Sequence, residues 1–87
     1  MKHAGENALD NLEPVLQDLR GFAGVREKKR GVFYRRSAAF IHFHEDPAGV
    51  FADVRIAGRW TRLPVNTAEE RDRFRSVVSE ALSIGFR

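Results

Sequence analysis

Between residues 31 and 65 the hydrophobic side chains recur with a period of two, and this alternation constrains the fold more than any other feature. Four strand-like segments lie in this stretch, at residues 32–35, 39–45, 50–56 and 59–65. They are separated by short turns around Arg36-Ser37, at residues 46–49 and at Ala57-Gly58, and short turns join antiparallel neighbours. We predict a four-stranded antiparallel meander, in which Pro64 either places the last strand at an edge or ends it.

An amphipathic helix is predicted before the meander. Pro14 is tolerated near its start because first-turn amides have no intrahelical acceptor, and Gly21 is the expected C-cap. Either Asn7 or Asn11 is the N-cap. The apolar face has steps of three and four: Leu9, Leu12, Val15, Leu16 and Leu19.

A second helix is predicted after the meander. Thr67 and Glu70 have the spacing of a capping box, and Gly85 ends the helix. The helical spacing of its apolar residues places them on one face: Phe74, Val77, Val78, Ala81 and Leu82.

The element order α-β-β-β-β-α predicts an α+β fold, a two-layer sandwich in which the four-stranded sheet packs against two helices. Residues 1–7 lack periodicity and are predicted to be a flexible tail before a single domain at residues 8–87. A chain of 87 residues supports one core but hardly encloses a large cofactor, so no cofactor is predicted.

Composition and hydropathy indicate the cytoplasm. The chain has no cysteine, so neither disulfides nor thiolate metal ligands are available. The first residues contain no apolar signal segment, and every apolar run is far shorter than a bilayer requires. We therefore expect no membrane partner.

Strand register divides the predicted sheet into two faces. A two-residue turn at Ala57-Gly58 pairs Asp53 with Arg62, and a loop at residues 46–49 pairs His42 with Asp53. One face is aliphatic and is expected to lie beneath the helices: Ile41, Phe43, Val50, Ala52, Val54, Leu63 and Val65. The other face combines aromatic rings, arginines and histidines: Phe33, Arg35, Phe40, His42, His44, Phe51, Asp53, Arg55, Trp60 and Arg62.

This second face is the predicted binding surface. Its rings at Phe33, Phe40, Phe51 and Trp60 form more contiguous apolar surface than a monomer normally exposes. We expect a helix or a second subunit of a homodimer to cover the face.

Nucleic acid is the alternative partner. Aromatic rings interleaved with arginine can stack unpaired bases of RNA or of a single strand and pair with the phosphates. A neighbouring basic loop would add phosphate contacts, unless its charges only keep a sheet edge soluble: Arg26, Lys28, Lys29 and Arg30.

Two histidines at alternate positions of one strand point the same way, which is a spacing that can chelate a metal ion. His42 and His44 would need a third ligand such as Asp53, but that carboxylate is more simply paired with Arg62, so no metal site is assigned. His42 and Asp53 are also two members of a hydrolytic constellation, but Ser37 lies too far along the chain to be a placed nucleophile. No catalytic residue is assigned, and a binding module is favoured over an enzyme.

Three segments carry a resemblance to other proteins. GVFYRRS at residues 31–37, AFIHFHEDPAG at residues 39–49 and FADVR at residues 51–55 resemble a group of short bacterial hypothetical proteins. This group has no assigned activity. The resemblance therefore implies a small cytoplasmic α+β domain and transfers no catalytic residue.

Overall fold

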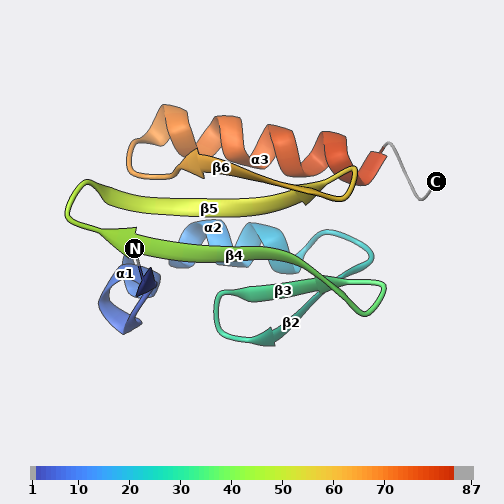
Figure 1. The fold of residues 1–87 in the computed structure, drawn as a ribbon, viewed down its shortest axis with the longest axis horizontal. Helices are drawn as coiled ribbons and strands as arrows, with labels where there is room; N and C mark the ends of the chain where they lie inside the picture. Colours follow the sequence, from blue (N-terminus) through green and yellow to red (C-terminus); the bar gives the residue numbers. More distant parts are fainter. Residues whose placement is uncertain (1, 84–87) are drawn as a thin grey trace.

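The computed structural model describes residues 2–83, which form six strands and three helices (Figure 1). All strand pairs are antiparallel, and the sheet order is β2-β3-β4-β5-β6, with β1 paired to β4 off this path. The elements are β1 (Lys2–His3), α1 (Glu6–Asn11), α2 (Glu13–Arg20), β2 (Val25–Lys29), β3 (Val32–Arg35), β4 (Ala38–Asp46), β5 (Gly49–Ile56), β6 (Arg59–Pro64) and α3 (Ala68–Ser83).

The α+β class and the meander from β3 to β6 agree with the sequence prediction. His42 pairs with Asp53, Asp53 pairs with Arg62 and Arg55 pairs with Trp60, as the turn lengths require. β6 is an edge strand that ends at Pro64. The turn before β5 is held by Asp46, whose Oδ1 accepts a hydrogen bond from the amide of Ala48 at 2.7 Å.

Two further strands correct the predicted four-strand layout. β2 contains the basic run, and its side chains alternate only between half-buried and exposed positions. Because four of its five residues are charged, the sequence shows no alternation of apolar and polar residues that would predict a strand. A charged edge strand resists pairing with other chains. β1 pairs Lys2 with Glu45 and His3 with His44, and α1 begins at Glu6, so the segment predicted as a tail contains secondary structure.

A β-bulge in β4 changes which side chains face the core. Phe33 pairs with Ile41, whereas the next residue, Tyr34, pairs with Ala39, so β4 has one extra residue at Phe40. Such a bulge turns two consecutive side chains toward one face. Phe40 and Ile41 accordingly both lie in the core, with exposed fractions of 2% and 0%.

The helix before the sheet is divided in two at Leu12. Pro14 lacks the amide hydrogen that would bond to the carbonyl of Asp10, which accounts for the interruption. The N-caps are Gly5 and Leu12, neither with a side-chain cap, so the prediction of Asn7 or Asn11 is wrong. Gly21 is the C-cap of α2 as predicted.

The helix after the sheet begins with the predicted capping box. The amide of Glu70 donates to Thr67 Oγ1 at 3.1 Å, and the amide of Thr67 donates to Glu70 Oε1 at 3.1 Å. The predicted stop at Gly85 lies outside the described residues. None of the helices within residues 2–83 has a stretch long and apolar enough to span a membrane.

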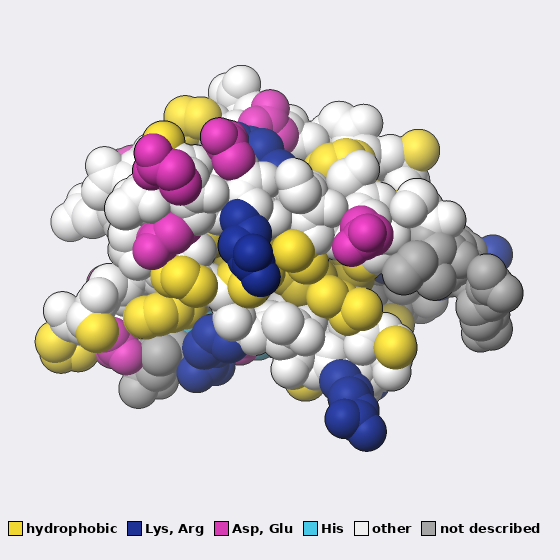
Figure 2. All heavy atoms as spheres, turned by 90° about the horizontal axis from the view of Figure 1, so that it is seen from above, with side chains coloured by type: hydrophobic (Ala, Val, Ile, Leu, Met, Phe, Trp, Pro, Cys, Tyr) yellow, Lys and Arg dark blue, Asp and Glu magenta, His cyan; other side chains and the backbone are white. Residues whose placement is uncertain are grey.

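One buried cluster joins the helices to a single face of the sheet. Its strand members include Ile41 paired with Val54 and Phe43 paired with Ala52, which alternate along β4 and β5. The helices supply Leu16, Phe74 and other buried residues. Seen from the side of α3 and β6, hydrophobic side chains form a band bordered by charged groups (Figure 2). His42, His44 and Asp53 alternate with the buried positions and therefore lie on the opposite face of the sheet.

Candidate metal centre

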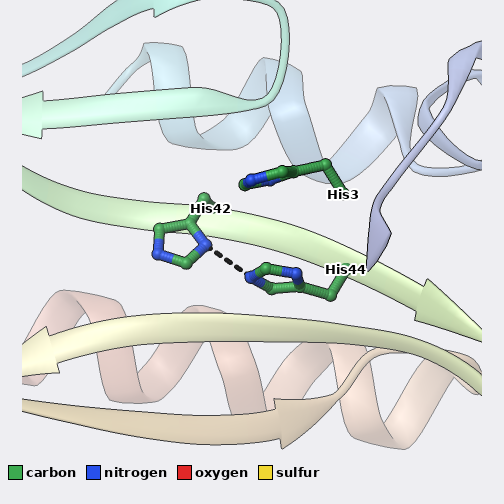
Figure 3. Close-up of side chains that lie close together, drawn as sticks. All are labelled: His3, His42 and His44. Carbon is green, nitrogen blue, oxygen red and sulfur yellow. Dashed lines mark hydrogen bonds between the residues drawn. The ribbon is translucent and has the colours of Figure 1, made fainter. Parts of the chain in front are cut away.

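The chain has three histidines, and all three meet on the sheet face that points away from the helices (Figure 3). His42 and His44 come from β4, where alternation places both rings on one face. His3 comes from β1 and lies opposite His44 in the strand pair. One ring nitrogen from each histidine can be chosen such that all three lie within 4.8 Å of one another.

Backbone contacts hold His3 in this position. The amide of Ala4 donates to the carbonyl of Phe43 at 3.0 Å, and the amide of Gly5 donates to the Glu45 carboxylate. The ring of His3 stacks on that of His44, with a centroid distance of 4.9 Å and an interplanar angle of 27°. The side chain of Glu45 therefore anchors the segment that supplies the third histidine.

Two of the imidazoles are in direct contact. His42 Nδ1 lies 2.8 Å from His44 Nε2, and His44 Nε2 also lies 3.2 Å from Asp53 Oδ2. An ionised carboxylate only accepts hydrogen bonds, so we assign the proton to His44 Nε2 and the acceptor role to His42 Nδ1. The lone pair of His42 Nδ1 thus points into the cluster.

Asp53 lies beneath the histidines and is the buried charged group of the sheet. Its exposed fraction is 5%, and Arg62 donates to both of its carboxylate oxygens, at 2.8 and 2.9 Å. These hydrogen bonds lower the pKa of Asp53 against the opposing effect of burial. The predicted row of His42, Asp53 and Arg62 is present in the sheet.

Burial and the neighbouring His44 lower the pKa of His42. Neutral imidazole is the form that binds metal ions, because protonation occupies the lone pair of the ligand nitrogen. The environment of His42 therefore favours the ligating form at neutral pH.

The three histidines form an open cluster that is wider than a closed tetrahedral metal site. Zinc–nitrogen bonds of about 2.0–2.1 Å in a tetrahedron place the ligand nitrogens roughly 3.3 Å apart. The 2.8 Å separation of His42 Nδ1 and His44 Nε2 is slightly shorter, so for both nitrogens to ligate an ion, His44 Nε2 would release its proton and the rings would move apart by a few tenths of an ångström. Asp53 Oδ2 lies 3.2 Å from this same nitrogen of His44, so in the metal-free protein it accepts the proton that a bound ion would displace.

The predicted aromatic surface is smaller than the sequence indicated. Phe33 and Phe40 are buried at 0% and 2% exposure, and Arg35 donates to the carbonyl of Ala81 in α3, so these three residues are not on the open face. The bulge at Phe40 is the reason. Phe51 is half-buried, and Trp60 is 44% exposed.

The predicted basic loop is mostly strand β2 and the turn that follows it. Arg30 donates hydrogen bonds to Glu6, Asp10 and Glu13, at 2.7, 2.7 and 2.9 Å, so its charge is already compensated. Three basic side chains of the run are exposed: Arg26, Lys28 and Lys29. The Lys28 ammonium lies 4.7 Å from the ring centroid of Tyr34.

Ser37, the serine considered as a nucleophile, does not lie beside the histidines. Ser37 lies in the turn between β3 and β4, five positions before His42. At 3.3 Å per residue this spacing is roughly 16 Å along the strand, far beyond hydrogen-bond reach.

His3 is the candidate site residue that sequence reasoning missed. The prediction treated it as part of a flexible tail, because residues 1–7 have no periodicity. One feature of the sequence could have indicated His3. Two of the three histidines have a chelating spacing, and the third lies in a short segment to which no element was assigned.

Comparison with protein-family models, with curated proteins and with solved structures finds no match to this chain.

Proposed function

We propose that this protein is a small binding module that holds a divalent transition-metal ion, of which Zn²⁺ is the first candidate, between His3, His42 and His44. The observation that carries this proposal is the convergence of every histidine in the chain, with ligand atoms within 4.8 Å of one another. Imidazole nitrogen is a preferred ligand of zinc, copper, nickel and iron.

Three further features support the proposal. Two ligands lie on a central strand, whose rigidity limits the cost of organising the site. The pKa of His42 is lowered, so little work is spent on deprotonation. In a two-layer arrangement, with the helices on one sheet face, the site on the other face stays accessible to ions. The proposed location is the cytoplasm, since the chain has no cysteine for an oxidising compartment to pair.

Thermal unfolding with and without Zn²⁺ tests the proposal. A ligand present at a hundred times its Kd stabilises the folded state by about 2.7 kcal/mol. For a domain of this length, that corresponds to a rise in Tm of about 10–20 °C. His44→Ala should abolish the rise and His3→Ala should weaken Zn²⁺ binding at least about tenfold, because each removes one metal ligand.

Lys2→Ala is the matched control for His3→Ala, because Lys2 is exposed in the same strand and has no ring nitrogen to offer. Its Zn²⁺ response should equal that of the wild type. An increase in Tm that survives both His3→Ala and His44→Ala would place the ion elsewhere and refute the proposal.

Trp60 provides an independent readout. It is the chain's one tryptophan, and its ring centroid lies 4.6 Å from that of His42. A paramagnetic ion such as Cu²⁺ bound at the site should quench its fluorescence, and His42→Ala should remove the quenching.

A contact surface for a second protein is the second candidate function. Trp60 is the one large hydrophobic side chain within residues 2–83 that is exposed, and the guanidinium of Arg55 lies 5.5 Å from its ring centroid. In a homodimer formed through this face, Trp60→Asp should shift the sedimentation coefficient to that of a monomer at high salt. A single-stranded oligonucleotide whose affinity falls steeply with salt would indicate nucleic acid as the partner.

A further inference from the structure

A pocket of about 270 Å³ lies beside two of the three histidines. One edge of β4 is paired with β3 as far as Ile41 and with β1 from His44 onward, so His42 and Phe43 lie between the two partners. His3 and His42 are both among the residues that line the pocket. The gap between β3 and β1 therefore opens next to two of the proposed metal ligands.

The pocket has both apolar and cationic walls. Leu9 and Val32 contribute hydrocarbon surface, and Lys29 and Tyr34 contribute an ammonium and a phenol. Within residues 2–83, neither the Lys29 ammonium nor the Tyr34 hydroxyl has a hydrogen-bond or salt-bridge partner, whereas the Arg30 guanidinium is bonded to three carboxylates. A positive charge and a hydrogen-bond donor are thus available to a ligand.

We infer that this pocket binds a small organic carboxylate, whose charged end is held between the metal ion and Lys29 and whose hydrocarbon part lies against Leu9 and Val32. The inference rests on the proposed metal site. Three histidines leave one tetrahedral position of zinc open, and a carboxylate oxygen is a common occupant of such a position. Tyr34 would donate a hydrogen bond to the same carboxylate.

The size and lining of the pocket restrict the ligand class further. A volume of about 270 Å³ lies just below the range of roughly 300–1,000 Å³ found for drug-sized ligands. The ligand therefore has few heavy atoms. Apolar walls favour a carboxylate with a short alkyl or phenyl group over inorganic phosphate, whose oxygens would lose hydration against them.

Titration of the Co²⁺-loaded full chain tests the inference. The visible absorption of Co²⁺ changes when a ligand enters its coordination sphere, so butyrate, acetate and phosphate can be compared directly. We expect butyrate to change the spectrum at the lowest concentration, acetate to bind more weakly and phosphate to bind most weakly. Phosphate binding as tight as butyrate binding would overturn the assigned ligand class.

Variants separate the pocket from the metal site. Lys29→Met should weaken butyrate binding by about tenfold or more, the effect expected for loss of a charged hydrogen-bond donor. Lys2→Met removes the same charge outside the pocket and should leave butyrate affinity unchanged. Ala39→Leu adds volume to the lining and should block butyrate while Co²⁺ still binds.

The two proposals fail in different ways. Co²⁺ that binds through His44 but shows no spectral change with butyrate refutes the pocket ligand and leaves the metal site standing. Failure of Co²⁺ to bind at all refutes the metal site, and the carboxylate inference fails with it.

Discussion

Removal of the Arg62 guanidinium should destabilise the metal-free protein far more than removal of a neighbouring arginine. Arg62 donates to both oxygens of Asp53, at 2.8 and 2.9 Å, and the side chain of Asp53 is only 7% exposed. Arg62→Ala leaves this carboxylate in the sheet without its guanidinium, facing the imidazoles of His42 and His44.

The exposed fractions of Arg62 and Asp53 determine how much stability we expect the protein to lose. A hydrogen bond to a charged group contributes roughly 1.5–3 kcal/mol, and breaking a fully buried ion pair costs roughly 3–5 kcal/mol. The side chain of Arg62 is 49% exposed, so water can reach Asp53 once the guanidinium is gone. We therefore expect the free energy of unfolding to fall by about 2 kcal/mol, which lowers Tm by about 8–16 °C in a domain of this length.

Urea unfolding at pH 7 in the presence of EDTA, followed by circular dichroism, measures this loss. Arg59→Ala is the matched control, because Arg59 is exposed on the same strand and makes no salt bridge within residues 2–83. Its effect should stay within about 0.5 kcal/mol. Equal losses in the two variants would show that Asp53 does not depend on Arg62, and would refute the reasoning.

Three other predictions concern the core, a turn and the charge network. Phe40→Ala should cost roughly 3–5 kcal/mol in urea unfolding because Phe40 is buried, and half-buried Phe51→Ala should cost clearly less; equal costs would contradict the bulge. Gly31→Ala should lower Tm more than Gly24→Ala: both glycines have positive φ, but only at Gly31 would the new Cβ lie 2.7 Å from a leucine methyl carbon of α1. Hydrogen bonds from two arginines lower the pKa of Glu13 from 4.5 to about 2, so its carboxylate stabilises the fold above pH 4.5, and that contribution is lost as pH falls through about 2. The stability gap between wild type and Glu13→Gln should therefore close over this interval, and a constant gap in urea titrations would argue against the network.

The sheet from β4 to β6 was predictable because short turns fix register. A two-residue turn at Ala57-Gly58 leaves one pairing that keeps the apolar residues on one face, and the pairs of Asp53 with Arg62 and Arg55 with Trp60 follow from it. The capping box at Thr67 was equally local, since both partners lie within one helical turn.

The missed features depend on contacts between distant residues. The bulge at Phe40 has no turn residue to mark it, and one extra position moved Phe33 and Phe40 from the predicted surface into the core. His3 pairs with a free edge of β4 that is about forty residues away in the sequence. The amide of Gly5 donates a hydrogen bond to the carboxylate of Glu45, which is 40 residues further along the chain. Periodicity within a short window does not contain this information.

The division of one edge of β4 between β3 and β1 also implies an order of events in folding. Turns of two residues connect β3 to β4, β4 to β5 and β5 to β6, and hairpins of this kind form in microseconds. β1 reaches β4 only by closing a loop of about forty residues, which carries a larger entropy cost. We therefore expect His3 to join His42 and His44 after the meander exists, so an ion at the proposed site would bind a sheet that is already formed and would not guide its assembly.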